Sequence, residues 1–373
     1  SRQKSEKKKL EATQANKKEN IEEELGELKE KIGQMIMIGF RGTEIKKDSH
    51  IVKVIKDLKI GGVILFDFDV PSKSFPRNIL NPNQTKKLIS DLQGFSKIPL
   101  FVAVDAEGGR VNRLKKEYGF LEIPSHQKLG QIDNLEFTKE KAQNLSQQLK
   151  ELGFNMNFAP VLDLNLNPQN PIIGKLERSF SSDPEKVFLH AKAFILAHIK
   201  NNIIPVAKHF PGHGSSRGDT HFEIEDITET FQEKELMPYK KLEKENLLKV
   251  VMVGHLMNKN LDEKYPASLS KVFIENILRK EIGFEGIVIS DDLGMKAISK
   301  NFSLEEAILQ AIQSGVNILL FSNNTETGYD ENLPYKVVDI ILQAVKDGKI
   351  KKERILESYE KIIKLKKEFE IIN

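Results

Sequence analysis

Eight short apolar runs, rich in β-branched residues, recur along the chain and constrain its fold more than any other feature. They are QMIMIGF (34–40), GGVILF (61–66), PLFVAVD (99–105), FNMNFAP (154–160), IIPVAKH (203–209), KVVMVGH (249–255), EGIVISDD (285–292) and NILLF (317–321). Longer charged segments with helical periodicity separate them, such as SQQLKELGF and SKVFIENILRKEIGF. Runs without polar alternation indicate strands that are buried on both faces, as in a parallel sheet covered by helices.

This alternation predicts an α/β fold, and the eight runs favour a single-domain (β/α)8 TIM-type barrel over residues 31–373. An open doubly wound sheet would alternate in the same way. However, no G-x-G-x-x-G turn follows the first run, so a dinucleotide-binding version has no support. The sequence shows no second domain and no internal repeat.

Residues 1–30 differ in composition from the rest of the chain. They contain SRQKSEKKKLEATQANKKEN, which has too few apolar residues to pack a core. Two interpretations fit equally well: a charged N-terminal tether, or an exposed helix supported by its mixed charges. Neither gives this segment a chemical role.

Composition excludes several classes of function. The 57 Lys and Arg residues nearly balance 54 Asp and Glu residues, so no nucleic acid partner is expected. The chain has no cysteine, which excludes disulfides, thiolate metal sites and a cysteine nucleophile. No apolar run approaches the roughly 20 residues of a membrane span. We expect a monomer that acts on a small molecule.

Polar residues close six of the eight apolar runs. In a parallel barrel the active site lies at the carboxyl ends of the strands. The residues at these predicted ends are Asp67, Asp105 with Glu107 and Arg110, Asp163, Lys208 with His209, His255, and Asp291 with Asp292. Any one of them could simply cap a turn or a helix. Six strands that end in this way predict a shared site.

The segment KHFPGHGSSRGDTH (208–221) is too rich in glycine for a helix and too polar for a core. It ends in an Asp-x-His element, Asp219 and His221. A carboxylate that holds one imidazole nitrogen fixes the tautomer and raises the basicity of the other nitrogen. The segment therefore predicts a proton shuttle on an active-site loop. The alternative is a charged surface loop.

The segment GIVISDDLGM (286–295) places two adjacent carboxylates after an apolar strand. We expect Asp291 to point into the mouth of the barrel, where it could act as a nucleophile. We expect Asp292 to turn toward the following loop and to bond to it or cap a helix.

These motifs, taken together, resemble a known family. VDAEGGRVNR, FAPVLDLNLNP, IIGKLERSFSSDP, KHFPGHG followed by DTH, and ISDDLGM occur in this order. The order is similar to that of family 3 glycoside hydrolases of the β-N-acetylglucosaminidase branch. The resemblance implies that Asp291 is the nucleophile and that His221, held by Asp219, is the acid/base. It also implies contacts to the terminal N-acetylglucosamine from Asp105, Arg113, Arg178, Lys208 and His209.

The implied reaction is retaining exo-cleavage of terminal β-linked N-acetylglucosamine through a covalent glycosyl-enzyme, without a metal or a cofactor. Peptidoglycan fragments (muropeptides) are the expected substrates, with soluble chitooligosaccharides as an alternative. A histidine acid/base also admits phosphate as acceptor, so a phosphorylase stays open. The charged extension favours the bacterial cell envelope over the cytoplasm.

Two other classes of protein compete with this interpretation. A metal-dependent barrel hydrolase could use His209, His213, His221, His255 and Asp291 as ligands, although Lys208 would place a cation beside them. A silent carbohydrate-binding module would more often rely on exposed aromatic residues, and the chain has no tryptophan.

Three local features limit what the resemblance predicts. Lys208 and Arg113 could belong to a salt-bridge network at the mouth, and Glu107 could merely pin its own loop. The family often has glutamine where this chain has Ala106. An insertion over Asp67 to Pro82 is expected to reshape the rim, which puts the preference for the leaving group in doubt.

Overall fold

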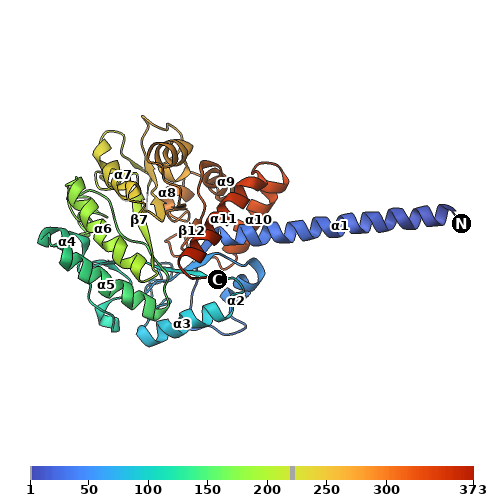
Figure 1. The fold of residues 1–373 in the computed structure, drawn as a ribbon, viewed down its shortest axis with the longest axis horizontal. Coiled ribbons are helices and arrows are strands. Elements are labelled where there is room, and N and C mark those ends of the chain that lie inside the picture. Colours follow the sequence, from blue (N-terminus) through green and yellow to red (C-terminus); the bar gives the residue numbers. More distant parts are fainter. Residues whose placement is uncertain (1, 219–222) are drawn as a thin grey trace.

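The computed structural model describes residues 2–218 and 223–373 and shows a closed parallel barrel (Figure 1). Its strands are β1 (Ile36–Gly39), β2 (Gly62–Ile64), β3 (Phe101–Val104), β6 (Met156–Asn157), β7 (Ile204–Phe210), β9 (Val250–Val253), β11 (Ile287–Ser290) and β12 (Leu319–Phe321). Neighbouring strands follow the order β11-β9-β7-β6-β3-β2-β1-β12. The ring closes where Ile289 bridges Ile318 in parallel. Seven strands lie within their predicted runs and β7 extends one residue beyond its run, to Phe210, so the predicted (β/α)8 barrel is confirmed.

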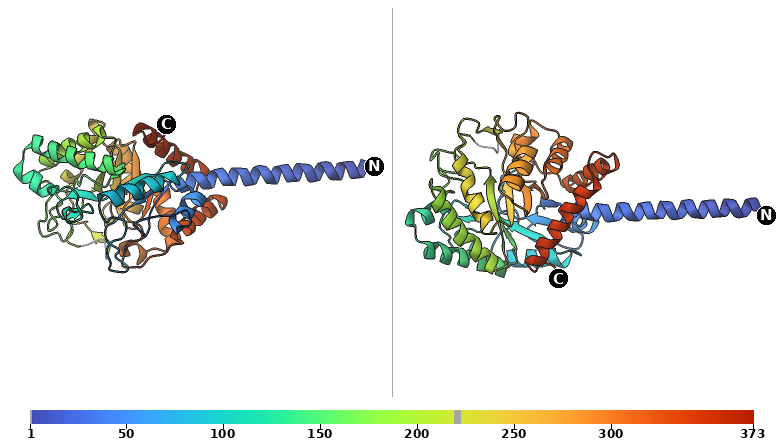
Figure 2. Two further views of the ribbon diagram at one scale, coloured as in Figure 1. Left: turned by 90° about the horizontal axis from the view of Figure 1, so that it is seen from below. Right: turned by 45° about the horizontal axis from the view of Figure 1, so that its top comes forward.

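Helices surround the barrel as an outer layer (Figures 1 and 2). They are α2 (His50–Leu58), α3 (Pro82–Gly94), α4 (His126–Ile132), α5 (Leu135–Leu152), α6 (Pro184–Lys200), α7 (Met237–Lys244), the π-type helix η4 (Val272–Glu281), α8 (Lys296–Ser299), α9 (Leu304–Ser314), α10 (Leu333–Lys346) and α11 (Lys352–Glu368). Local signals set their ends. Helix α9 begins with a capping box between Ser303 and Glu306 and ends at Gly315, whose φ of 113° favours glycine.

Short elements lie in the segments that follow β3, β7 and β9. They are the antiparallel pair β4 (Ala106–Gly108) and β5 (Val111–Asn112), the parallel pair β8 (Glu225–Asp226) and β10 (Leu256–Met257), and the single turns η1 (Lys116–Tyr118), η2 (Glu233–Leu236) and η3 (Ala267–Leu269). The β4–β5 pair follows β3 directly and carries Glu107, which forms ion pairs with Arg178 and Lys208.

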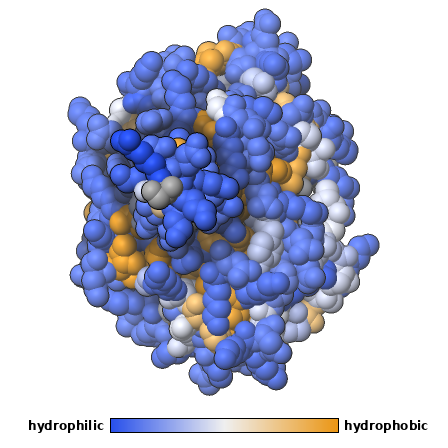
Figure 3. All heavy atoms as spheres, turned by 90° about the vertical axis from the view of Figure 1, so that its right-hand side faces the viewer, coloured by the Kyte–Doolittle hydropathy of each residue, from blue (hydrophilic) through white to orange (hydrophobic). Residues whose placement is uncertain are grey.

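Helix α1 (Arg2–Gln34) projects away from the barrel (Figures 1 and 2). Only its last turns are buried, through Leu28 and Ile32, where it packs against α10 and α11. The face viewed along α1 from its free end is mainly hydrophilic (Figure 3). Among the described residues, no helix combines the length and the apolar character that crossing a membrane requires.

The buried amine of Lys366 attaches α11 to the amino end of the barrel. Its Nζ donates hydrogen bonds to Gln34 Oε1 at 2.8 Å, to the Gly61 carbonyl at 3.0 Å and to the Pro99 carbonyl at 2.7 Å. Burial lowers the pKa of Lys366 to about 7. The amine joins the segments that precede β1, β2 and β3, so its role is to hold these segments in position.

We expect Lys366→Met to destabilise the protein by about 3 kcal/mol, because three acceptors would each lose a hydrogen bond inside the protein. Urea unfolding measures this change. Lys364→Met, at an exposed position of the same helix, is the matched control and should stay within about 0.5 kcal/mol of wild type. Equal effects of the two substitutions would contradict the assignment.

Candidate active site

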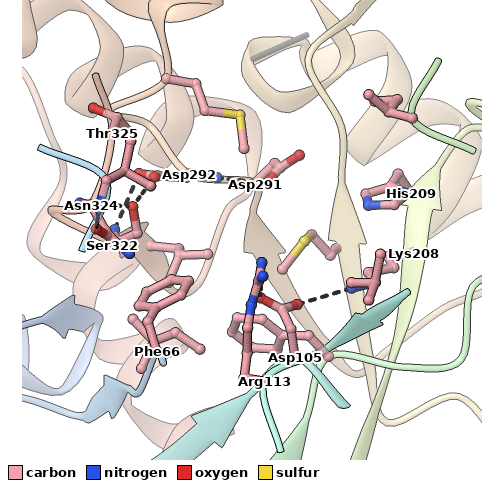
Figure 4. A pocket seen from close by; sticks show the side chains of 18 of the residues that line it. Phe66, Asp105, Arg113, Lys208, His209, Asp291, Asp292, Ser322, Asn324 and Thr325 are labelled. Carbon is pink, nitrogen blue, oxygen red and sulfur yellow. Dashed lines mark hydrogen bonds and ion pairs between the residues drawn. The ribbon is translucent and has the colours of Figure 1, made fainter. Parts of the chain in front are cut away.

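A cavity of about 480 Å³ opens at the carboxyl ends of the barrel strands (Figure 4). Its lining includes these predicted site residues: Asp105, Arg113, Arg178, Lys208, His209 and Asp291. A volume of this size is typical of sites for small molecules. Asp219 and His221 lie outside the described residues, so their predicted part in the site stays a prediction.

Glu107 is the buried centre of an ionic network beneath this cavity. Its carboxylate accepts hydrogen bonds from Arg178 Nη2 at 2.7 Å and from Arg178 Nε at 3.0 Å. Lys208 Nζ lies 2.8 Å from Glu107 Oε1 and 3.1 Å from Asp105 Oδ1. Burial alone would raise the pKa of Glu107, but the charges of Arg178 and Lys208 hold it well below its usual range. One carboxylate therefore fixes two cations of the cavity wall.

The contacts of this network decide two points that the sequence left open. The first is whether Lys208 and Arg113 belong to a salt-bridge network, and the second is whether Glu107 only pins its own loop. Lys208 lies in a salt-bridge network and also lines the cavity, so the two expectations for this residue are compatible. Arg113 approaches Asp105 more loosely, with Nη2 at 3.9 Å from Oδ2. Glu107 does more than pin its own loop, because its partners come from the segment after β6 and from β7.

Asp163 is a second buried carboxylate, and it orients His209. Its Oδ2 lies 2.7 Å from His209 Nδ1, and its Oδ1 accepts hydrogen bonds from the backbone N–H of His209 and of His213. Burial favours the neutral acid, yet the charge and hydrogen bond of His209 lower the pKa of Asp163. Asp163 thus fixes the start of the loop that leads toward Asp219. From the sequence, Asp163 was expected only at a strand end, without a role. The signal that could have shown its role is that consecutive parallel strands end side by side, which brings Asp163 next to His209.

Asp291 and Asp292 follow β11 and have different surroundings. Asp291 is 8% exposed and lines the cavity. Asp292 is more deeply buried and accepts hydrogen bonds from the Ser322 hydroxyl and from the Gly294 N–H at 2.9 Å. It bonds to its own loop and to the end of β12, as expected from the sequence. This anchoring fixes the backbone from which Asp291 extends.

His255 supports the same backbone from behind. Its Nε2 lies 2.8 Å from the Asp292 carbonyl and its Nδ1 lies 2.7 Å from Ser268 Oγ. Because both ring nitrogens have these partners, His255 is unsuited to the metal-ligand role considered above. Within residues 2–218 and 223–373, no three His, Asp or Glu side chains group as a metal ion requires.

Glu235 on η2 lies behind the loop that follows β7. It is buried, and its Oε2 accepts a hydrogen bond from the Gln232 N–H at 2.8 Å. A Cβ atom at Gly212 would come within 2.9 Å of Glu235 Oε1, so the loop backbone packs closely on this carboxyl group. Burial, with a smaller contribution from the charge of Asp163, raises the pKa of Glu235 to about 7.

We expect ionisation of Glu235 to weaken the fold. The folded pKa lies above the unfolded value, so stability is lost as the pH rises from about 5 to about 8. Glu235→Gln should remove this loss, which amounts to about 3 kcal/mol at most. Melting temperatures of the variant and wild type across this pH range measure it. Glu233→Gln, exposed on the same turn, should keep the wild-type pH profile.

Comparison with known proteins defines the class to which this site belongs. Residues 27–365 match the glycosyl hydrolase family 3 N-terminal domain, so the chain belongs to this family of glycoside hydrolases. The predicted resemblance is therefore confirmed.

The curated relatives include β-hexosaminidase LpqI of Mycobacterium tuberculosis, 32% identical over 350 residues that cover 91% of this chain and 82% of LpqI. The β-hexosaminidase of Haemophilus influenzae is 33% identical over 78% of this chain and 80% of its own length. Among solved structures, a family 3 β-N-acetylglucosaminidase from Paenibacillus sp. str. FPU-7 superposes with a TM-score of 0.83 at 33% identity, over 92% of this chain. The chain spans 63% of the length of that Paenibacillus protein.

Proposed function

We propose that the protein is a retaining exo-β-N-acetylglucosaminidase. The observation that carries this proposal is the position of Asp291 in the cavity, facing a set of cationic and polar side chains that Glu107 and Asp163 hold in place. The names of the relatives at about one-third identity support the choice of sugar.

The polar side chains have donors and acceptors suited to a sugar that enters with its hydroxyl groups first. Lys208, His209 and Arg178 provide donors, and Asp105 provides an acceptor. Glu107 and Asp163 fix these side chains before substrate arrives. The side chains therefore lose little conformational freedom when the substrate binds. The anomeric carbon would then lie next to Asp291.

In the first step, a carboxylate oxygen of Asp291 bonds to the anomeric carbon as the bond to the leaving oxygen breaks. His221, held by Asp219, donates a proton to that oxygen. In the second step, His221 takes a proton from water, whose oxygen bonds to the anomeric carbon and releases Asp291. The chain reaches this pair through the loop that follows β7, in which Asp163 holds the N–H of His213.

The proposed substrates are peptidoglycan fragments with a terminal β-linked N-acetylglucosamine, encountered in the cell envelope. The cavity is open at the rim, so a glycan or peptide attached to the leaving sugar could extend into solvent. Phosphate is the alternative acceptor, because a histidine acid/base carries no negative charge that would repel it.

The test uses 4-nitrophenyl β-N-acetylglucosaminide, with the β-glucoside as control, and follows product by NMR with and without phosphate. We expect N-acetylglucosamine, released first as the β-anomer, at a rate that does not depend on phosphate. N-acetylglucosamine 1-phosphate as the main product would make the protein a phosphorylase. Failure to cleave the N-acetylglucosaminide, or initial release of the α-anomer, would refute the proposal.

A further inference from the structure

The insertion after β2 folds into a hairpin at the rim of the cavity, which we call the rim hairpin (residues 67–78). Asp69 and Ser74 pair across it in antiparallel fashion. The Asp69 carboxylate accepts hydrogen bonds from Arg41 Nε at 2.9 Å and from Arg77 Nη1 at 2.7 Å. The hairpin is therefore closed by an ion pair at its base, and Arg77 is only 2% exposed.

Two long-range anchors attach the rim hairpin to the segment after β12. Arg77 Nη2 donates hydrogen bonds to the Ser322 and Asn323 carbonyls, each at 3.0 Å. The side chain of Asn324 accepts from the Val70 N–H at 2.8 Å and donates to the Phe68 carbonyl at 2.9 Å. These bonds fix the backbone at Phe68 and Val70 relative to the barrel.

Phe68 is the aromatic residue that this fixed backbone presents. Its side chain is 41% exposed and lines the cavity. Phe75 on the same hairpin is similarly exposed, but its ring stacks on Tyr118 at 4.7 Å and does not line the cavity. Isolated exposed apolar residues are common on protein surfaces. Phe68 differs because it stands at the cavity mouth on a backbone held from two sides.

The contacts of Asn324 with the backbone at Phe68 and Val70 indicate which part of a substrate would reach Phe68. Asp105 and Lys208 extend from the β3 and β7 side of the ring, whereas Asp291 and Asn324 follow β11 and β12. Figure 4 shows Lys208 across the cavity from Asn324, with Asp291 between them. In a pyranose the C4 hydroxyl and the anomeric carbon lie at opposite ends. With the hydroxyl end at Asp105 and Lys208, the scissile bond points past Asp291 toward the rim hairpin.

We propose that Phe68 forms the wall of the leaving-group subsite and selects leaving groups that carry a pyranose ring. This inference rests on the proposed function. The apolar C–H face of the ring would pack on the phenyl face, which is the kind of contact that aromatic walls of ligand sites make. Met295 and Thr325 also line the cavity. The subsite would raise the rate only for substrates long enough to reach it.

The test compares two substrates that share N-acetylglucosamine and differ in the leaving group. In N,N′-diacetylchitobiose the leaving group is a sugar, whereas in N-acetyl-β-glucosaminyl fluoride it is one atom that cannot reach the rim hairpin. We expect Phe68→Ala to lower kcat/KM about tenfold for the disaccharide and less than about twofold for the fluoride. Phe68→Tyr should keep most of the disaccharide activity, because it retains the aromatic face.

Leu80→Ala is the matched control, because Leu80 belongs to the same insertion, is 40% exposed and does not line the cavity. This substitution should leave kcat/KM unchanged for both substrates. If Phe68→Ala lowered kcat/KM equally for both substrates, or for neither, the assignment of the subsite to Phe68 would be wrong. A wild-type protein that cleaves neither substrate would refute the proposed function itself, and the subsite with it.

Discussion

Replacement of Asp291 by alanine is expected to abolish turnover of 4-nitrophenyl β-N-acetylglucosaminide, with a fall in kcat of about 10⁴-fold or more. The carboxylate would be lost from the position in the cavity where the proposed covalent bond forms. Folding should be preserved, since the anchoring bonds to Ser322 and Gly294 belong to Asp292. Steady-state kinetics and circular dichroism measure the two effects.

Azide provides a sharper check on this variant. A small anion can occupy the space left by the carboxylate and attack the anomeric carbon from the same face. Asp291→Ala should then yield the α-glycosyl azide, whereas wild type should not. Asp292→Asn is the neighbouring control and should mainly lower stability, because Asp292 serves its own loop. Full activity of Asp291→Ala without azide would eliminate Asp291 as the nucleophile.

The second large effect is expected for Glu107→Gln. Removal of this charge leaves Arg178 and Lys208 inside the protein without their shared carboxylate, which should cost about 3–5 kcal/mol of stability. The pKa of Glu107 is depressed, so its contribution is present above its unfolded pKa and is lost only in strong acid. The difference from wild type should therefore be constant from about pH 5 to about pH 8.

Urea unfolding measures the stability, and KM should rise because two side chains of the cavity wall lose their fixed positions. Glu177→Gln is the matched control: Glu177 pairs with Arg110 at 3.1 Å, but both side chains are largely exposed. Such a pair contributes less than about 1 kcal/mol. A Glu107→Gln protein as stable as the Glu177→Gln protein would show that the buried network is dispensable.

The barrel could be predicted from the sequence because its signal is local. Each strand is a short run buried on both faces, and eight such runs between helical segments leave few other folds. Residues that close those runs, such as Lys208 and Asp291, could be placed at one end of the barrel for the same reason. Asp219 and His221 remain predictions from the motif alone.

The contacts that hold the site could not be predicted in this way. Arg77 bonds to carbonyl groups about 245 positions later in the chain, and no periodicity of the sequence reports such a pairing. From the sequence, Glu107 could be assigned only to its own loop, because its partners are distant in the chain. Arg178 lies beyond α4 and α5, and Lys208 lies beyond α6 as well. The rim hairpin was recognisable only as an insertion, since its position depends on the segment after β12.

The projecting helix α1 has a practical consequence for handling this enzyme. It enters the barrel at the amino end of β1, whereas the cavity opens at the carboxyl ends of the strands. The exposed part before Leu28 is about 40 Å long at 1.5 Å per residue. A fluorophore, an affinity handle or a solid support coupled near Arg2 would stand well clear of the catalytic opening, so immobilised protein should turn over substrate as freely as protein in solution.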